Sequence, residues 1–299
     1  MPRLVLLVLM LVCTAAPAHA ATTCAIGPAG TTQRVPIGDT GRAMTVHLPS
    51  GFDSAKPAPL VLLLHGSGST GAAMLRDSKL AEAADGHGFI VAAPDAGIPH
   101  DQGFVWNIPG VPTVAGRIPG PQDADDVAYL GRAIDWFVSQ GCADQARVYA
   151  TGLSGGGRMT SWLGCVAAPR LAAIAPVVGL RAGNPRKDDP TRPDTKSCRP
   201  AKPMPVIAFA GDADRTNPTQ GGGAGYWQYT MHAAEARWAA LNGCSAAPTT
   251  RWVAAGVYEE LYSGCRGDAD VAGRITVGGG HSWVADNDAM WSFFARHRR

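Results

Sequence analysis

Short, continuously apolar runs alternate with helical patterns along most of this chain, and this alternation limits the fold more than any other feature. The clearest run, at residues 59–64, contains no polar residue, as expected of a strand covered on both faces of a sheet. We expect further strands at residues 89–93, 147–151, 171–178, 205–210 and 273–277, and helices at 72–85, 125–140, 158–166, 231–241 and from 286 onward. Strands that alternate with helices are typical of a mainly parallel sheet. The sequence therefore predicts an α/β fold with three layers, α/β/α.

The bulk composition is that of a globular protein. The chain has 299 residues, of which 46% are hydrophobic and 17% are charged, whereas a disordered chain is more charged and less apolar. We find no internal repeat and no linker, so we expect residues 21–299 to form a single domain. The formal net charge is only +2, which favours neither nucleic acid nor an anionic membrane surface as a partner. The basic run at residues 296–299 is interpreted as a solvated tail.

The N-terminus has the layout of a secretory signal peptide. Arg3 precedes an apolar run at residues 4–12, and small residues lead to Ala20, the pattern of a segment that is cut after that alanine. The apolar run is too short to span a bilayer. We therefore expect residues 1–20 to be a signal peptide, and the mature protein to be secreted or periplasmic without stable membrane insertion.

Six cysteines follow the expected signal peptide. An even number in an exported chain favours disulfides over thiol catalysis or metal binding. Fifteen connectivities are open to six cysteines, and only one pair flanks an expected hairpin, at residues 250–262. We expect the pairs Cys244–Cys265, which flank that hairpin, Cys165–Cys198 and Cys24–Cys142. No CxxC or His/Cys cluster has zinc spacing, so we expect no metal site and no cofactor.

A G-x-S-x-G motif at residues 152–156 stands between an expected strand and an expected helix. In this context the motif predicts a nucleophile elbow, a sharp turn that lifts the hydroxyl of Ser154 clear of the backbone. The alternative is a Gly-rich turn with a capping serine. The strand before the motif and the helix after it favour the nucleophile.

The serine needs a base, because its hydroxyl is a poor nucleophile at neutral pH. In the chain order serine, acid, histidine, the candidates are His232, His281 and His297. His232 lies in an expected helix and His297 in the charged tail, so both are interpreted as surface histidines. His281 follows a strand and three glycines, where its ring can reach a site, and is the predicted base.

The remaining parts of such a site are an acid and two backbone donors. The acid is expected after the strand at residues 205–210, where Asp212 and Asp214 are both candidates and spacing does not decide between them. The developing oxyanion needs preorganised donors, and the backbone amides of Ser67 and Gly155 fit that role. His65 is interpreted as a structural hydrogen-bonding residue.

Large aromatic residues lie on the same loops as these groups. They are candidate walls of a substrate site, and burial in the core is an equally weighted alternative. The four residues are Trp106, Tyr226, Trp227 and Trp283.

Four segments of the chain together carry a resemblance to a known family. They are Leu64-His65-Gly66, residues 152–159 (Gly-Leu-Ser-Gly-Gly-Gly-Arg-Met), residues 221–227 leading to Trp238 and Asn242-Gly243-Cys244, and residues 279–283 (Gly-Gly-His-Ser-Trp). In order and spacing they resemble the polyhydroxybutyrate depolymerase and feruloyl esterase family of secreted esterases. In that family a His-Gly-x-x-Asp segment carries the acid of the triad, so the resemblance assigns the acid to Asp214. Ala210 stands here where the family has the histidine.

The resemblance implies an α/β-hydrolase fold and a serine esterase that works through an acyl-enzyme, without a cofactor or metal. It implies as substrate either a hydroxyalkanoate polyester or oligoester, or a feruloyl or acetyl ester of plant polysaccharide. An α/β-hydrolase peptidase is the alternative activity, and a non-catalytic binding protein on this fold is a further alternative. We expect no nucleic acid and no obligate protein partner.

Overall fold

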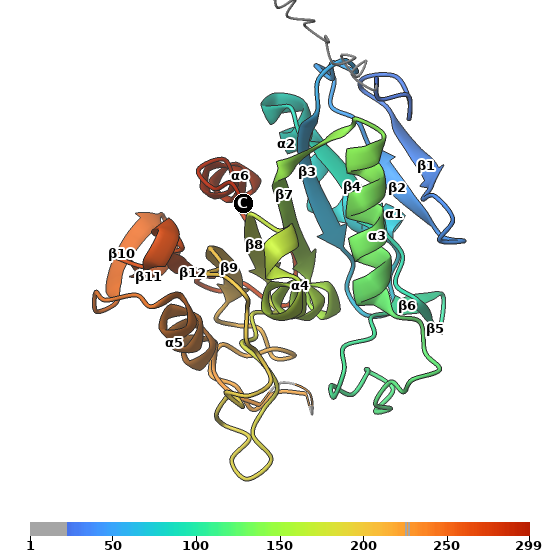
Figure 1. Cartoon of the computed structure of the whole chain (residues 1–299). Helices are drawn as coiled ribbons and strands as arrows, with labels where there is room; N and C mark the ends of the chain where they lie inside the picture. Colours follow the sequence, from blue (N-terminus) through green and yellow to red (C-terminus); the bar gives the residue numbers. More distant parts are fainter. Residues whose placement is uncertain (1–22, 225, 227) are drawn as a thin grey trace, which may run out of the picture.

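The computed structural model describes residues 23–224, 226 and 228–299, and a ten-stranded sheet runs through its centre (Figure 1). The order of the strands across the sheet is β1-β2-β4-β3-β7-β8-β9-β12-β11-β10. The strands are β1 (Thr32–Pro36), β2 (Ala43–His47), β3 (Ala58–Leu64), β4 (Ile90–Pro94), β7 (Ala143–Leu153), β8 (Ala173–Val177), β9 (Val206–Gly211), β10 (Thr249–Ala254), β11 (Val257–Tyr262) and β12 (Val271–Thr276). The six strands from β4 to β12 in this order pair in parallel, which confirms the mainly parallel sheet.

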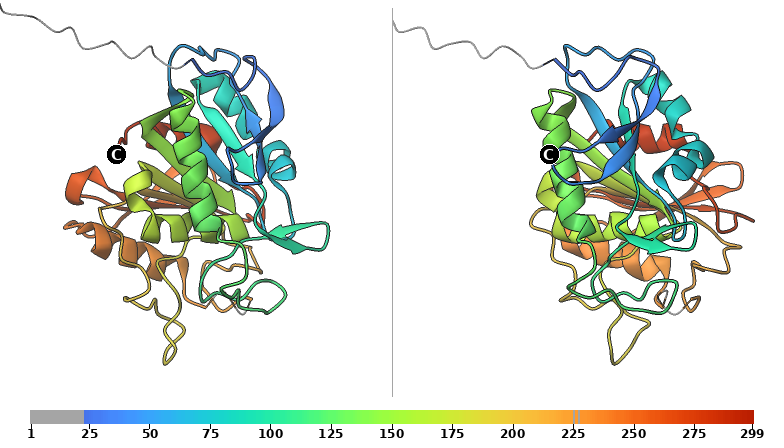
Figure 2. Two further views of the ribbon diagram at one scale, coloured as in Figure 1. Left: turned by 45° about the vertical axis from the view of Figure 1, so that its right-hand side comes forward. Right: turned by 90° about the vertical axis from the view of Figure 1, so that its right-hand side faces the viewer.

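Helices cover both faces of this sheet. On one face, α3 (Asp126–Ser139), α4 (Gly155–Val166) and α5 (Met231–Asn242) contribute Leu130, Met159 and Trp238 to one buried cluster. On the other, α1 (Gly71–Ser78), α2 (Leu80–His87) and α6 (Asn287–Phe294) contribute to a second cluster. The right-hand view of Figure 2 shows α3 on one side of the sheet and α1, α2 and α6 on the other. The three-layer α/β/α architecture expected from the sequence is confirmed.

Some local elements differ from the sequence-based expectations. Two N-terminal strands, β1 and β2, extend the sheet by antiparallel pairing and were not expected. The single helix expected at residues 72–85 is two helices, because Lys79 adopts a left-handed conformation with φ 53° and ends α1. The long loop expected at residues 96–121 contains a small hairpin of β5 (Ile98–His100) and β6 (Gly103–Val105).

Three disulfides join distant parts of the described chain. They are Cys24–Cys142, Cys165–Cys198 and Cys244–Cys265, the same three pairs that the sequence led us to expect. Disulfides persist in oxidising environments, so they are consistent with a protein that functions outside the cytoplasm. Among the residues that the structure describes, no helix is both long enough and apolar enough to cross a membrane.

The three arginines of the C-terminal run are exposed, as expected of a solvated tail, whereas the interpretation of His297 as a surface histidine is wrong. His297 is only 8% exposed, its ring packs on Phe293, and its carbonyl accepts a hydrogen bond from the Tyr149 hydroxyl at 2.9 Å. The Arg299 amide donates to the Ala146 carbonyl. His297 is thus a core residue, and burial lowers its pKa from 6.5 to about 4.

This buried histidine predicts a loss of stability in mild acid. The free energy of unfolding should fall as the pH is lowered from 6.5 toward about 4, because the unfolded chain binds a proton that the folded chain excludes. A pKa difference of this size is equivalent to about 3 kcal/mol. Urea denaturation of the wild type and of His297→Leu at pH 7 and pH 4.5 measures this contribution. We expect the variant to lose less stability than the wild type, and an equal loss in both proteins would contradict this role of His297.

Candidate active site

Ser154 occupies the sharp turn that joins β7 to α4. Its φ of 54° is rare for a residue with a side chain, and its amide donates to the Val177 carbonyl at 2.9 Å. The turn is tight because α4 starts against the end of β3. A Cβ atom added at Gly156 would lie 2.1 Å from the Leu64 carbonyl oxygen, so only glycine fits there. The motif thus forms the elbow geometry expected from the sequence.

The side chains of Ser154, His281 and Asp214 form a continuous hydrogen-bonded chain. His281 Nε2 lies 2.9 Å from Ser154 Oγ, and His281 Nδ1 lies 2.7 Å from Asp214 Oδ2. With its proton on Nδ1, the imidazole donates to the carboxylate and leaves Nε2 to accept the serine proton. The three residues follow the ends of β7, β12 and β9, and carboxyl ends of parallel strands are where ligands bind in open α/β sheets.

The loop after β9 brings Asp214, and not Asp212, to His281. Asp214 is 2% exposed, and its Oδ1 accepts the amides of Thr216 at 2.8 Å and Asn217 at 2.9 Å. Its other oxygen is thereby directed at His281. Asp212 is exposed and accepts the Gly278 amide at 2.6 Å. Asp212 therefore closes the turn between β9 and the loop that bears His281.

The amides expected to stabilise an oxyanion lie next to each other. Gly155 is the first residue of α4, where a backbone N–H has no acceptor within the helix. A Cβ atom added at Gly155 would lie 3.0 Å from the Ser67 nitrogen, so the two backbones approach closely. His65 holds the loop that bears Ser67 in place. Its Nδ1 donates to the Gly66 carbonyl at 2.7 Å, and its Nε2 accepts the Ala96 amide at 3.0 Å. Burial lowers the pKa of His65, in keeping with a neutral, structural ring.

The aromatic candidates have different surroundings. Trp106 is 4% exposed and donates to the His65 carbonyl at 2.8 Å, so it supports the oxyanion loop as a core residue. Trp283 is partly buried and donates to Asn287 Oδ1 on α6, which holds the loop that bears His281. Tyr226 is half-buried, with Arg158 over its ring. Trp227 lies outside the described residues.

Arg158, on the first turn of α4, is a residue whose role the sequence did not reveal. It is 4% exposed, its Nη2 lies 3.4 Å from Ser67 Oγ, and its guanidinium lies 3.8 Å from the centre of the Tyr226 ring. No carboxylate of the described residues pairs with it, and its Nε has no partner there. Burial lowers the pKa of Arg158 to about 10, so the group stays cationic at neutral pH.

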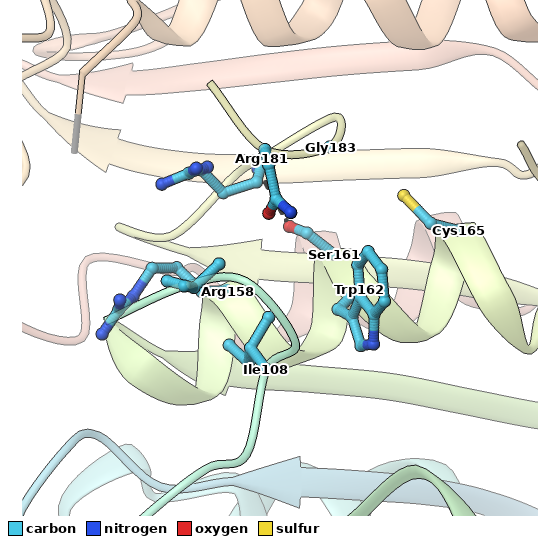
Figure 3. Close-up of a pocket in the computed structure, with 9 residues that line it drawn as sticks. Ile108, Arg158, Ser161, Trp162, Cys165, Arg181 and Gly183 are labelled. Carbon is cyan, nitrogen blue, oxygen red and sulfur yellow. Dashed lines mark hydrogen bonds between the residues drawn. The ribbon is translucent and has the colours of Figure 1, made fainter. Parts of the chain in front are cut away.

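Arg158 lies between two small pockets beside the elbow. One pocket is lined by Ser67, Gly155 and Trp106 together with Arg158. Figure 3 shows the other, where Arg158 and Arg181 extend their guanidinium groups toward the N-terminal end of α4, with Ile108 and Trp162 also in the lining. The sequence does contain one signal for this site: Arg158 is a single charged residue among the small and apolar residues that begin α4. The result is a buried positive potential next to the place where the expected oxyanion forms.

Comparison with known proteins finds similarity to several esterases. Feruloyl esterase B of Piromyces equi is 33% identical over 260 residues, which cover 84% of this chain. The solved structure of an acetyl xylan esterase from Aspergillus awamori superimposes with a TM-score of 0.62 and 18% identity, over 89% of this chain and 99% of that chain. The likeness to this solved structure shows that the chain has the α/β-hydrolase fold. Acetylxylan esterase A of Emericella nidulans is a further relative, 28% identical over 158 residues, or 52% of this chain and 49% of that protein.

The chain matches only part of each of these curated relatives. The chain spans about half or less of the curated relatives it matches, 44% of the Piromyces protein and 50% of another esterase relative. No family model matches the chain. The comparisons thus show the α/β-hydrolase fold.

Proposed function

We propose that this chain is a serine carboxylic ester hydrolase. One observation carries the proposal: His281 contacts Ser154 Oγ at 2.9 Å on one side and Asp214 at 2.7 Å on the other. A non-catalytic binding protein does not require a hydrogen-bonded serine, histidine and aspartate. Acyl transfer requires all three, as a nucleophile, a base and a group that orients the base.

The proposed reaction has two stages. Ser154 Oγ attacks the ester carbonyl while His281 Nε2 takes its proton, and Asp214 stabilises the imidazolium that forms. The amides of Ser67 and Gly155 stabilise the tetrahedral oxyanion. His281 then gives the proton to the leaving alcohol, and an acyl group remains on Ser154. A water molecule, activated by His281, hydrolyses this acyl-enzyme and releases the acid. Each of these steps uses side chains and amides of this chain.

We propose feruloyl or acetyl esters of plant polysaccharide as the first substrates to test. The relatives support this choice, because two of them are a feruloyl esterase and an acetylxylan esterase. A hydroxybutyrate-type oligoester or polyester is the second candidate, supported by the four motif segments. Methyl ferulate, acetylated xylan, an amorphous hydroxybutyrate film and a fluorogenic peptide, tested side by side with purified protein, separate these cases. Turnover of the peptide but of no ester would overturn the proposal.

We also propose that residues 1–20 are a cleaved signal peptide and that residues 21–299 form one secreted catalytic domain. The three disulfides support an oxidising destination. The N-terminal segment itself lies outside the described residues. N-terminal sequencing of protein collected from the exporting host's medium or periplasm tests this, and an intact Met1 in that material would contradict it.

Arg158 is proposed as a positioning residue for the oxyanion, acting through Ser67. Replacing it in Arg158→Met should lower kcat by about tenfold while KM changes little, because a fixed charge near the oxyanion lowers the energy of the transition state more than that of the bound substrate. Arg158→Lys should recover part of the loss. The free energy of unfolding of Arg158→Met should not be lower than that of the wild type, because a buried charge without an ion-pair partner contributes little to folding. Steady-state kinetics with p-nitrophenyl acetate measure the effect, with the exposed Arg76→Met as control. A rise in KM at constant kcat would contradict this role.

A further inference from the structure

We propose that α5 and β11 carry a binding site for a divalent cation, with His232, Glu235 and Glu260 as its protein ligands. One ligand atom from each residue lies within 4.8 Å of those of the other two. None of the three belongs to the triad, and the proposal does not depend on the esterase activity. Spacing in the sequence does not reveal this site, because the ligands come from α5 and from β11, the second strand of the hairpin that follows it.

The fold brings the two carboxylates onto one face of the sheet. Figure 1 shows α5 beside β11 and β12. Glu260 on β11 is paired with Gly273 on β12. The side chain of Glu235 on α5 lies against Gly273. A Cβ atom added at Gly273 would lie 1.5 Å from Glu235 Oε1. The glycine therefore makes the space in which the Glu235 carboxylate lies, beside Glu260.

The Glu235 carboxyl group is buried without a partner. Glu235 is 2% exposed, and within the described part of the chain its Oε1 has no hydrogen-bond partner. Burial, and then the charge of Glu260, raise the pKa of Glu235 to about 8. A buried polar group with no partner is costly, so this oxygen is positioned for a ligand that the protein itself does not supply.

On the opposite face of β11, the carboxylate of Glu259 is neutralised by two arginines. Glu259 lies 2.8 Å from Arg251 and 2.8 Å from Arg274. By contrast, no Lys or Arg of the described residues pairs with Glu235 or Glu260. The basic group in contact is His232, whose Nδ1 lies 2.9 Å from Glu260 Oε1 and whose side chain is 65% exposed.

Tyrosine side chains complete the surroundings of the two carboxylates. Burial, and then a hydrogen bond to Glu260, raise the pKa of the Tyr262 hydroxyl. Burial, followed by the charges of Asp212, Glu235 and Glu260, also raises the pKa of Tyr258. The cluster itself combines two carboxylates and one imidazole, with a deficit of positive charge.

A first-row divalent cation such as Zn²⁺ or Mn²⁺ matches this donor set. An imidazole nitrogen and carboxylate oxygens bind such ions at about 2.0–2.2 Å. The ion would neutralise both carboxylates and give Glu235 Oε1 a partner, and the exposed side next to His232 leaves coordination positions for water. Because imidazole and carboxylate groups bind a metal ion only in their deprotonated forms, binding should release protons and strengthen as the pH rises.

Calorimetric titration of the chelator-treated protein with ZnCl₂, and separately with MnCl₂, tests the site. We expect the wild type to bind one equivalent of at least one of the two ions, more tightly at pH 8 than at pH 6, with proton release seen as a dependence of the heat on the buffer. Glu235→Gln and His232→Ala should each weaken binding by at least about tenfold. Glu82→Gln, an exposed carboxylate on α2, is the matched control and should bind as the wild type does.

Two results would overturn the proposal. One is the absence of saturable binding of either ion to the wild type. The other is binding that both variants retain at full strength, which would place the ion elsewhere. Circular dichroism checks the fold of each variant, and if Glu235→Gln does not fold, the exposed His232→Ala decides the matter.

Discussion

Ser154→Ala should lower the rate of ester hydrolysis by about 10⁵-fold, because removal of the nucleophile leaves only the catalysis by the oxyanion donors and by substrate binding. The change keeps the Cβ atom of a residue that is 8% exposed, so the fold should survive it. Hydrolysis of p-nitrophenyl acetate by the purified variant gives the rate, and urea denaturation confirms the fold.

Ser282→Ala is the matched control for this experiment. Ser282 is the exposed neighbour of His281, so its hydroxyl is close to the site without lying in the hydrogen-bonded chain. We expect this variant to keep nearly all of the activity. Retention of more than a tenth of the wild-type rate by a folded Ser154→Ala variant would show that another group performs the attack.

Asp214→Asn should lower kcat by about 10³- to 10⁴-fold. An asparagine that donates its amide hydrogens to His281 favours the wrong tautomer, in which Nε2 carries the proton and no longer accepts the one from Ser154. The Thr216 and Asn217 amides now bind Asp214 Oδ1, and the asparagine oxygen can still accept them, so the loop should keep its shape. Steady-state kinetics at neutral pH measure the loss.

Asp212→Asn is the natural control for that variant. The asparagine oxygen can still accept the Gly278 amide that Asp212 binds, and the residue does not contact His281. We expect kcat within about threefold of the wild type, as is usual for an exposed substitution that keeps its contact. A large loss in Asp212→Asn together with a small loss in Asp214→Asn would reverse the assignment of the acid.

The sequence predicted the sheet and the position of Ser154 and His281 because these depend on local patterns. Continuous apolar runs define buried parallel strands, and a motif between a strand and a helix defines the elbow. The acid was different. Asp212 and Asp214 both follow β9, and the choice between them depends on which backbone amides fold back onto each carboxylate, which residue spacing does not encode. The resemblance to a family chose Asp214, and the structure brings the same residue to His281.

Other features depend on contacts between segments that are far apart in the sequence. The tail at residues 296–299 is charged and its arginines are exposed, yet the ring of His297 is buried against Phe293. Strand β1 has a polar pattern, because it pairs only with β2 at the edge of the sheet. Arg158 looks like an ordinary helix charge until the loop that bears Ser67 covers it. In each case the environment is supplied by a partner that the local sequence does not reveal.

If Ser154 is a nucleophile activated by His281, a reagent that attacks activated serines should label it covalently. The purified protein is treated with a fluorophosphonate, and the modified peptide is identified by mass spectrometry while ester hydrolysis is followed in the same sample. We expect one adduct, on Ser154, that accumulates in step with the loss of activity and is absent from His281→Ala. An adduct on another residue, or full activity after Ser154 is modified, would show that Ser154 is not the nucleophile.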